Sequence, residues 1–377
     1  MTIYILFYIV VLLLCMIETN YKYIKIGVRL DTKKVSIFII AVFLLAIGLL
    51  CAEELGGDSL NYKYSYWTPI SKLSISDALS YDRDWGFSLF IWIVSKFTSK
   101  FIVFRKILYI IASFSLIFWV RKYSKNVALS FLFFLSFNYL GLLLCLYRMA
   151  LAVAIAIWGY EFAVKRKFIP YIILTLLAST FHKTAIVLLI FYPMIYKKVK
   201  CDRIIKNGIW ILFAAIMMFL APYIATIYTR NDYSKDLGTG GYALLLLLIV
   251  MYIYIHIYIR NLNIETPINI KKVEKKNNQY RNSLETKIEL VLGDVYELSK
   301  SAIYIQIIAL GVSIATRMLF FSVPFLPIII SEIFQLQNDK RERNSLLFGI
   351  MIILTILFIR NIISDGYQIV PYISIFE

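Results

Sequence analysis

The chain is poor in charge, in cysteine and above all in histidine. Only 17% of its 377 residues are Asp, Glu, Lys or Arg, whereas soluble domains are about a quarter charged. The 2 histidines form no HExxH-type pair, and the 4 cysteines show no CxxC spacing. A glycine-rich nucleotide-binding loop is also missing. We therefore expect no metal site and no cofactor, and we expect the cysteines to be small buried side chains.

Long apolar runs dominate the chain instead. Hydrophobic residues make up 60% of it, and the mean hydropathy is +0.75. A helix needs about 20 mainly apolar residues to cross a bilayer, although shorter helices can cross inside a bundle. The sequence therefore predicts an all-α, polytopic membrane protein in which residues 1–377 form a single helical membrane domain.

The basic residues lie between these apolar runs. The formal net charge of +17 is in itself also typical of proteins that bind nucleic acid. Here, however, Lys and Arg occur in short clusters between apolar runs, which is the distribution of cytoplasmic loops. The first cluster, Lys22 to Lys34, places its loop in the cytoplasm and the N-terminus outside. We therefore expect membrane lipid, and no nucleic acid, around this protein.

The clusters together predict roughly twelve crossings with both termini outside. The expected crossings are residues 2–17, 36–52, 107–120, 127–146, 149–164, 168–181, 184–196, 208–228, 242–259, 301–316, 318–334 and 345–359. An outer loop at 53–86, a cytoplasmic loop at 260–290 that becomes helical near its end, and an outer tail at 360–377 complete the chain. Gly86 to Ser95 is expected to be a short interfacial or re-entrant helix, which leaves Lys96 to Lys106 on the outer side, against the rule.

Arg148 and His182 interrupt apolar segments and are the first candidates for a site. From Met149 the chain descends about 16 residues, or about 24 Å, to the basic cluster Lys165 to Lys167. Phe168 to Phe181 then climbs back by slightly less, so Arg148 and His182 are expected at similar depth near the outer face. Ionisable residues at membrane depth are costly and are usually functional.

Other polar residues are expected at the same face. They are Arg317 at a helix end, the loop residues Asp58, Arg83 and Asp84, and the tail residues Tyr367, Pro371 and Tyr372. Arginine pairs bidentately with phosphate, so Arg148 and Arg317 suit a pyrophosphate that leaves as a glycosidic bond breaks. His182 is suited to take a proton from an acceptor hydroxyl, because its unperturbed pKa lies near working pH.

Each of these residues also has a structural interpretation. Arginines at helix ends often reach to lipid headgroups, and His182 beside Lys183 also fits an ordinary helix end. Asp58 and Asp84 also fit solvated loop carboxylates. The aromatic run of Tyr62, Tyr64, Tyr66 and Trp67 suits either stacking on sugar rings or an interfacial belt.

At these residues the chain resembles the EpsG family of Wzy-type polysaccharide polymerases. The resemblance is carried by Gly57-Asp58 with Tyr62, Asp84-Trp85-Gly86-Phe87, Tyr147-Arg148-Met149-Ala150, Thr180-Phe181-His182-Lys183-Thr184-Ala185, Arg317, Tyr367 and Pro371-Tyr372. Three positions depart from the family pattern. The family commonly has Gln where this chain has Met149, often Glu in place of Asp84, and often Arg where Glu53 and Glu54 stand.

The resemblance implies a bacterial inner-membrane glycosyltransferase that joins oligosaccharide repeat units carried on undecaprenyl pyrophosphate. The growing chain would leave its lipid pyrophosphate for the nonreducing end of a new unit, without nucleotide sugar or metal. Arg148 and Arg317 would hold pyrophosphate, and His182 or Asp84 would activate the acceptor. Asp58, Arg83, Tyr62, Tyr367 and Tyr372 complete the expected substrate-binding set, and a chain-length regulator is the expected protein partner.

Two other functions stay open from the sequence. A flippase for lipid-linked oligosaccharides would handle the same substrate, but transporters tend to place polar sites at the midplane and to carry internal repeats, neither of which is evident here. A ligase that moves finished glycan to another acceptor would use similar chemistry.

Overall fold

The computed structural model describes residues 1–26, 28–195, 203–228, 240–261, 282–311, 313–336 and 339–376. Helices dominate these residues, and their single sheet is the hairpin of β1 (Tyr23–Ile26) and β2 (Val28–Asp31). They form two compact units, one of Met1–Leu189 with Met351–Glu377 and one of Ile190–Ile350. Whether the chain behaves as one membrane domain stays a prediction. Most of the predicted cytoplasmic loop, residues 262–281, lies outside the described residues.

Six helical segments in the described residues are long and apolar enough to cross a membrane. They are α1 (Thr2–Asn20), α2 (Thr32–Leu49), α7 (Phe101–Tyr123), Tyr147–Val164, Ala315–Phe334 and α20 (Lys340–Ser364). A bent pair, α8 (Val127–Ser136) with α9 (Tyr139–Cys145), adds a seventh. Reaching twelve crossings would require the shorter apolar helices to cross as well. The protein is therefore a multi-pass, helical membrane protein, while the count of twelve and the outer position of both termini stay predictions.

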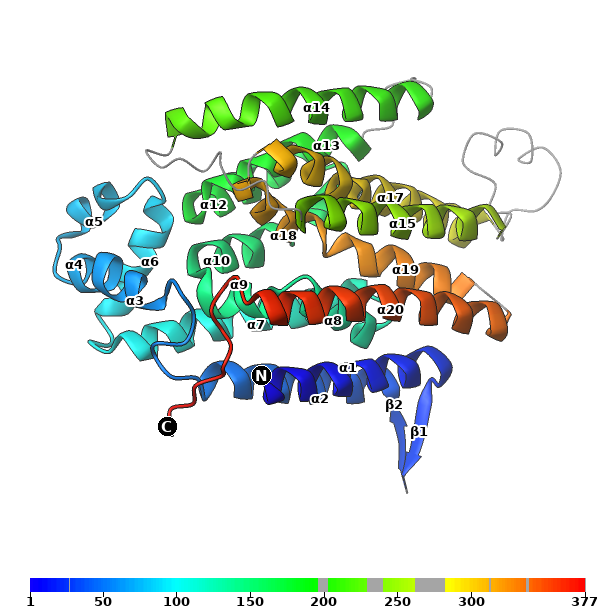
Figure 1. Cartoon of the computed structure of the whole chain (residues 1–377), viewed down its shortest axis with the longest axis horizontal. Coiled ribbons are helices and arrows are strands. Elements are labelled where there is room, and N and C mark those ends of the chain that lie inside the picture. The colour runs from blue at the N-terminus through cyan, green and yellow to red at the C-terminus, as the bar shows by residue number, and fades with distance from the viewer. Residues whose placement is uncertain are drawn as a thin grey trace. The chain divides into compact units, whose positions relative to one another are not determined.

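Helices of the first unit differ in how much of their surface is buried: α8 and α9 are buried on all sides, whereas α1 buries one stripe. On α1 the buried side chains are Tyr4, Phe7, Tyr8, Val11, Leu14 and Cys15, which follow the three- and four-residue spacing of a helix face. The hydroxyls of the buried Tyr8 and of Thr355 share a hydrogen bond at 3.1 Å, and the Tyr8 ring stacks on Phe358 of α20 with the ring centres 4.0 Å apart. Figure 1 shows α20 beside α1.

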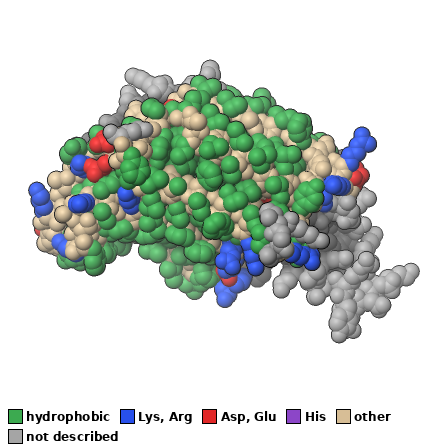
Figure 2. Space-filling model, turned by 90° about the horizontal axis from the view of Figure 1, so that it is seen from below, with side chains coloured by type: hydrophobic (Ala, Val, Ile, Leu, Met, Phe, Trp, Pro, Cys, Tyr) green, Lys and Arg blue, Asp and Glu red, His purple; other side chains and the backbone are tan. Residues whose placement is uncertain are grey.

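Apolar side chains also cover the outside of this unit. Exposed large residues on α1 and α2 include Leu6, Ile9, Leu13, Phe38 and Val42. Figure 2 shows hydrophobic side chains over most of the face seen from below, with Lys and Arg toward its edges. Exposed apolar surface of this kind is suited to contact with lipid tails, because a water-exposed surface would carry charged side chains among the apolar ones.

Several predicted crossings contain breaks that the sequence analysis did not foresee, and two of these crossings flank Arg148. Residues 127–146 divide into α8 and α9, which meet at 68°. Asn138 at the break has φ 59, a left-handed conformation that Asn tolerates, and its side chain accepts from the Gly141 N–H at 3.2 Å. Residues 149–164 likewise divide into α10 (Tyr147–Ala156) and α11 (Gly159–Val164). Since α10 begins at Tyr147, Arg148 lies in its first turn.

The predicted outer loop 53–86 is largely helical. It contains α3 (Ser59–Tyr62), the π-helix η1 (Lys63–Trp67), α4 (Thr68–Ile70) and α5 (Ile75–Tyr81) (Figure 1, left). The short helix predicted at Gly86 to Ser95 is confirmed as α6 (Trp85–Ser95), and α7 then begins at Phe101 rather than at Ile107. These short helices position the acidic residues between α5 and α6.

The C-terminal tail is hydrogen-bonded to the start of the predicted outer loop. Helix α20 continues to Ser364, so the predicted tail from 360 begins as helix. The amide of Gly57 then donates to the Tyr367 carbonyl at 2.9 Å, and that of Ala52 donates to the Ile373 carbonyl at 2.9 Å. The Val370-Pro371 peptide within the tail is cis. The two segments are thus joined by backbone hydrogen bonds.

Arg105 belongs to the basic stretch Lys96 to Lys106, which the predicted topology leaves on the outer side. It is 2% exposed, and its guanidinium donates to the carbonyls of Ala52, Leu55 and Leu144, the last two at 2.7 and 3.3 Å. A basic residue that satisfies buried carbonyls belongs to the fold and does not report the side of the membrane. Arg105 is therefore not evidence for either side of the membrane, and the position of this stretch stays a prediction.

Arg105→Met is expected to destabilise the protein by about 3 kcal/mol or more, because buried carbonyls would lose charged donors. Thermal unfolding of the purified protein in detergent measures the change. Lys106→Met, at the half-buried neighbouring position, is the matched control and should unfold close to the wild-type temperature. Equal melting of the two variants would contradict the assigned role.

The second unit is centred on α17 (Asn282–Gly311), which packs against α14 (Arg203–Tyr228), α15 (Gly240–Asn261) and α19 (Phe325–Leu336). The start of α17 at Asn282 confirms that the predicted cytoplasmic loop is helical near its end. A Cβ on Gly311 would lie 1.9 Å from the Met218 carbonyl oxygen, so glycine allows α17 to approach α14 there. The 3-10 helix η3 (Ser313–Met318) and α18 (Leu319–Ser322) follow. The short α13 (Leu188–Ile195) connects the two units in sequence.

Candidate functional site

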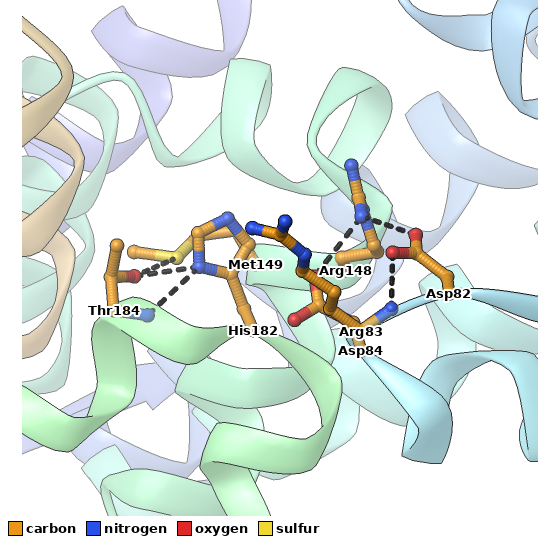
Figure 3. A network of polar contacts seen from close by, with 7 residues as sticks. All are labelled: Asp82, Arg83, Asp84, Arg148, Met149, His182 and Thr184. Atoms are coloured by element: carbon orange, nitrogen blue, oxygen red, sulfur yellow. Dashed lines mark hydrogen bonds and ion pairs between the residues drawn. The ribbon is translucent and has the colours of Figure 1, made fainter. Parts of the chain in front are cut away.

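Arg148 forms the centre of a charged cluster in the first unit. Its Nη1 atom lies 2.9 Å from Asp82 Oδ2 and 3.0 Å from Asp84 Oδ2, and Figure 3 shows both carboxylates turned toward it. The side chains of Arg148 and Asp84 are 25% and 10% exposed, so both ion pairs are only partly screened by water. The Nε–H of Arg148 is buried and has no acceptor among the described residues.

Aromatic rings form one wall of this cluster. The Arg148 guanidinium carbon lies 5.0 Å from the Tyr66 ring centre and 5.9 Å from that of Tyr62, within cation–π range. Both tyrosines come from the π-helical segment and its entry, where a wider turn often marks a functional site. Tyr62 is only 6% exposed and packs on Tyr147 at 4.7 Å. Its ring therefore packs on Tyr147 within cation–π range of Arg148, and a substrate-binding role for Tyr62 stays a prediction.

Asp84 has an unusual carboxyl environment. It is the N-cap residue of α6, yet its side chain makes no capping hydrogen bond and turns to Arg148. Burial raises its pKa from 3.8 to about 6, while Arg148, Lys183 and a hydrogen bond from the Lys183 backbone oppose that shift. A carboxyl group with a pKa near 6 exchanges protons close to working pH, which suits a general acid or base.

His182 stands at the joint between α12 (Phe168–Phe181) and the 3-10 helix η2 (Lys183–Val187). Its Nδ1 atom lies 2.6 Å from Thr184 Oγ1 and 3.4 Å from the Thr184 backbone nitrogen. Thr184 Oγ1 is also 3.5 Å from the sulfur of Met149, the residue after Arg148 (Figure 3). The segments of Arg148 and His182, 34 residues apart in the printed sequence, therefore meet in space.

A close helix contact holds Asp84 beside His182. A Cβ on Gly86 would lie 2.1 Å from Thr180 Oγ1 and 2.8 Å from Thr180 Cβ. Only glycine allows α6 to approach α12 this closely. Because Asp84 precedes α6 and His182 follows α12, this contact sets the spacing of the two groups.

Arg83 and Asp58 are further predicted site residues of the first unit. Arg83 is exposed, its backbone N–H donates to Asp82 Oδ1, and Figure 3 shows its side chain extending toward the His182 ring. Asp58 is the N-cap residue of α3, and its backbone N–H donates to Cys145 Sγ at 3.4 Å.

The two predicted tail residues have structural contacts. Tyr372 donates its hydroxyl to the Ile47 carbonyl at 2.9 Å, and its ring lies 5.9 Å from that of Tyr4. The Tyr367 ring covers Gly141, where a Cβ would lie 2.1 Å from Tyr367 Cδ2. These contacts fix the tail against the bundle, and a substrate-binding role for either tyrosine stays a prediction.

Arg317, the second predicted pyrophosphate ligand, lies half-buried in η3 of the second unit. Its meeting with Arg148 therefore stays a prediction.

Sequence reasoning named Asp84 and included Tyr66 in an aromatic run, but it assigned no role to Asp82 or Thr184. The triplet Asp82-Arg83-Asp84 was a usable signal, because alternating charges beside an apolar helix are uncommon in this chain. Thr184 had no such signal, since its role depends on the ring orientation of His182. Among the described residues, no three His, Cys, Asp or Glu side chains are grouped so as to hold a metal ion.

A family model described as the EpsG family matches residues 34–374. The chain belongs to the EpsG family. The match spans every charged residue of the cluster, together with His182 and Arg317. Membership indicates a role in polysaccharide biosynthesis at a membrane. Comparisons with curated proteins and with solved structures found no match for this EpsG-family protein.

Proposed function

We propose that this EpsG-family protein is a Wzy-type polymerase, which joins oligosaccharide repeat units carried on undecaprenyl pyrophosphate at the outer face of the bacterial inner membrane. The observation that carries the proposal is the Asp82–Arg148–Asp84 cluster beside His182. It combines a fixed cation with carboxyl and imidazole groups, the chemical groups that a transfer from a diphosphate to a hydroxyl requires.

Arg148 would both hold the carboxylates and bind the leaving pyrophosphate. Its Nη1 atom holds Asp82 and Asp84, and its other N–H groups would face the departing pyrophosphate, because a guanidinium matches phosphate oxygens geometrically. Arg83 and Lys183 flank Asp84 in sequence or in space and would add positive charge on the same side. A pyrophosphate-binding role for Arg317 stays a prediction from the sequence.

The glycan profile of a strain lacking this protein tests the proposal. We expect single repeat units to accumulate on their lipid carrier at the outer face, with long polymer lost, and a plasmid copy of the gene should restore the polymer. Gel separation with mass spectrometry of extracted lipid-linked glycans measures this.

Two other profiles would overturn the proposal. Intact polymer stranded on the carrier would identify a ligase. Single units retained at the inner leaflet, protected from an added impermeant glycosidase, would identify a flippase.

A further inference from the structure

The hairpin of β1 and β2 is fixed to the ends of two long helices. Helix α1 ends at Asn20 and β1 begins at Tyr23, while β2 passes into α2 without an intervening residue. Thr32, the first residue of α2, is only 4% exposed. Its hydroxyl donates to the Tyr21 carbonyl at 2.8 Å, and its amide donates to the Lys22 carbonyl at 3.1 Å. The base of the hairpin is therefore held against the start of α2, which sets the direction of the strands.

This direction carries the hairpin along the membrane surface. Both α1 and α2 are long and apolar enough to cross a bilayer, and their exposed side chains, such as Phe38 and Val42, are suited to contact with lipid tails. Figure 1 shows the hairpin running across the direction of these two helices and away from the other helices of the first unit. Strands that leave the ends of membrane-spanning helices in this way lie over the lipid beside the bundle, at the level of the headgroups.

The hairpin has two unlike faces. Antiparallel pairing places Ile24 opposite Leu30 and Tyr23 opposite Asp31, and successive residues of a strand point to opposite sides. One face therefore carries Ile24 and Leu30, and Leu30 is 41% exposed. The other face carries Tyr23 and Arg29, whose guanidinium carbon lies 3.8 Å from the Tyr23 ring centre. An apolar face backed by an aromatic and cationic face is typical of segments at a membrane interface.

The exposed charge around the hairpin is positive. Lys22, Arg29 and Lys34 are exposed, and Asp31 is the one acidic residue of the stretch 21–34. The Asp31 carboxylate accepts from two backbone amides at the start of α2, at 2.9 and 3.3 Å, so it serves that helix as the N-cap. Three cations thus face outward with little acidic charge to balance them. Such a surface attracts anionic headgroups.

We propose that the β1–β2 hairpin is an interfacial anchor that binds anionic phospholipid headgroups, with the face of Ile24 and Leu30 against the lipid and with Lys22 and Arg29 paired with phosphate. It lies at the end of α1 and α2 that the sequence predicts to be cytoplasmic, where the leaflet carries anionic lipid. A two-stranded hairpin is marginally stable by itself in water, so it needs a surface to pack on, and the bilayer supplies one. The inference does not depend on the polymerase function.

Lipid fits the hairpin better than a protein partner does. The hairpin extends beside helices whose exposed surface is itself apolar, so lipid is the neighbour that these helices already require. Long basic side chains can reach the phosphates while apolar neighbours stay at the boundary of the acyl chains. Lipid therefore satisfies both faces at once, whereas a protein partner would have to match two unlike faces beside the membrane.

Spin labels on the protein in nanodiscs of phosphatidylcholine and phosphatidylglycerol test the position of the hairpin. The three cysteines that the structure describes are buried, so a Cys201→Ser protein accepts single labels at chosen positions. Labels at Ile24→Cys and Leu30→Cys should be relaxed several-fold more by dissolved oxygen than by a water-soluble nickel complex. A reference label at Phe38→Cys on α2, where the native side chain is 70% exposed, should behave in the same way, and an Arg29→Cys label should show the opposite preference. Nickel access at positions 24 and 30 equal to that at 29 would place the hairpin in water and overturn the proposal. Protection of all three labels from both reagents would overturn it in favour of a protein contact.

The lipid that stays bound tests the headgroup. Protein reconstituted with equal amounts of phosphatidylglycerol and phosphatidylcholine is repurified in mild detergent, and its bound lipid is identified by mass spectrometry. Arg29→Gln should retain at least about twofold less phosphatidylglycerol relative to phosphatidylcholine. The matched control Lys72→Gln removes an exposed charge between α4 and α5 and should keep the wild-type ratio. Thermal unfolding of both variants shows that each is folded. An unchanged lipid ratio in Arg29→Gln would overturn the headgroup assignment, and it would leave the polymerase proposal untouched.

Discussion

Arg148→Ala is expected to reduce polymerisation of lipid-linked repeat units by at least about 100-fold. The change removes the partner of two carboxylates, at 2.9 and 3.0 Å, and the cation proposed to hold the leaving pyrophosphate. Arg148→Lys should also lose at least about tenfold, because a compact ammonium group cannot hold two carboxylates and still offer a second donor edge. Gel profiles of glycan from a complemented deletion strain measure both effects.

The matched control for this experiment is Arg121→Ala. Arg121 lies exposed in the last turn of α7, away from the carboxylates, so its replacement should leave normal long polymer. Membrane expression of each variant is compared by immunoblot. Long polymer at wild-type yield in the Arg148→Ala strain would refute the assignment of the cluster.

Gly86→Ala is expected to reduce polymerisation about as much as Arg148→Ala, although it alters no polar group. The added methyl carbon would lie 2.1 Å from Thr180 Oγ1, so α6 must move away from α12 at a cost of about 1–3 kcal/mol. The movement separates Asp84 from His182, and a displacement of about 1 Å can lower a rate about 100-fold. Initial rates in proteoliposomes measure the loss.

A compensating variant shows whether the cause is steric. Gly86→Ala combined with Thr180→Gly removes the colliding atoms and should recover much of the activity, relative to Thr180→Gly alone. Gly208→Ala is the control, because a Cβ at Gly208 meets nothing within 4 Å. Wild-type activity in Gly86→Ala would show that the spacing of α6 and α12 does not matter for the reaction.

Much of the helical arrangement follows from apolar length and charge placement. Each predicted crossing has a corresponding helix or broken helix, because burial of a long apolar run requires internally bonded backbone. The approach of the Arg148 and His182 segments also follows from arithmetic on helix rise, since the turn at Lys165 to Lys167 is short.

The finer features depend on contacts that leave no periodic pattern. The bend at Asn138 results from one left-handed residue, and hydropathy does not register it. Arg105 resembles any other basic residue in the sequence, and only its three carbonyl partners identify its role. The tail contacts are mostly bonds of the main chain, so their partners cannot be inferred from side-chain type.

The docking of the tail has a consequence for how the protein is made. The amides of Gly56 and Gly57 find their acceptors on Gln368 and Tyr367, residues synthesised more than three hundred positions later. During translation and insertion these amides lack their acceptors until the final helix has entered the bilayer. Asp58 and the helices after it are not held in place before that. Nascent chains that stall before α20 therefore carry an unfinished segment from Gly56 onward, which ties activity to completion of the whole polypeptide.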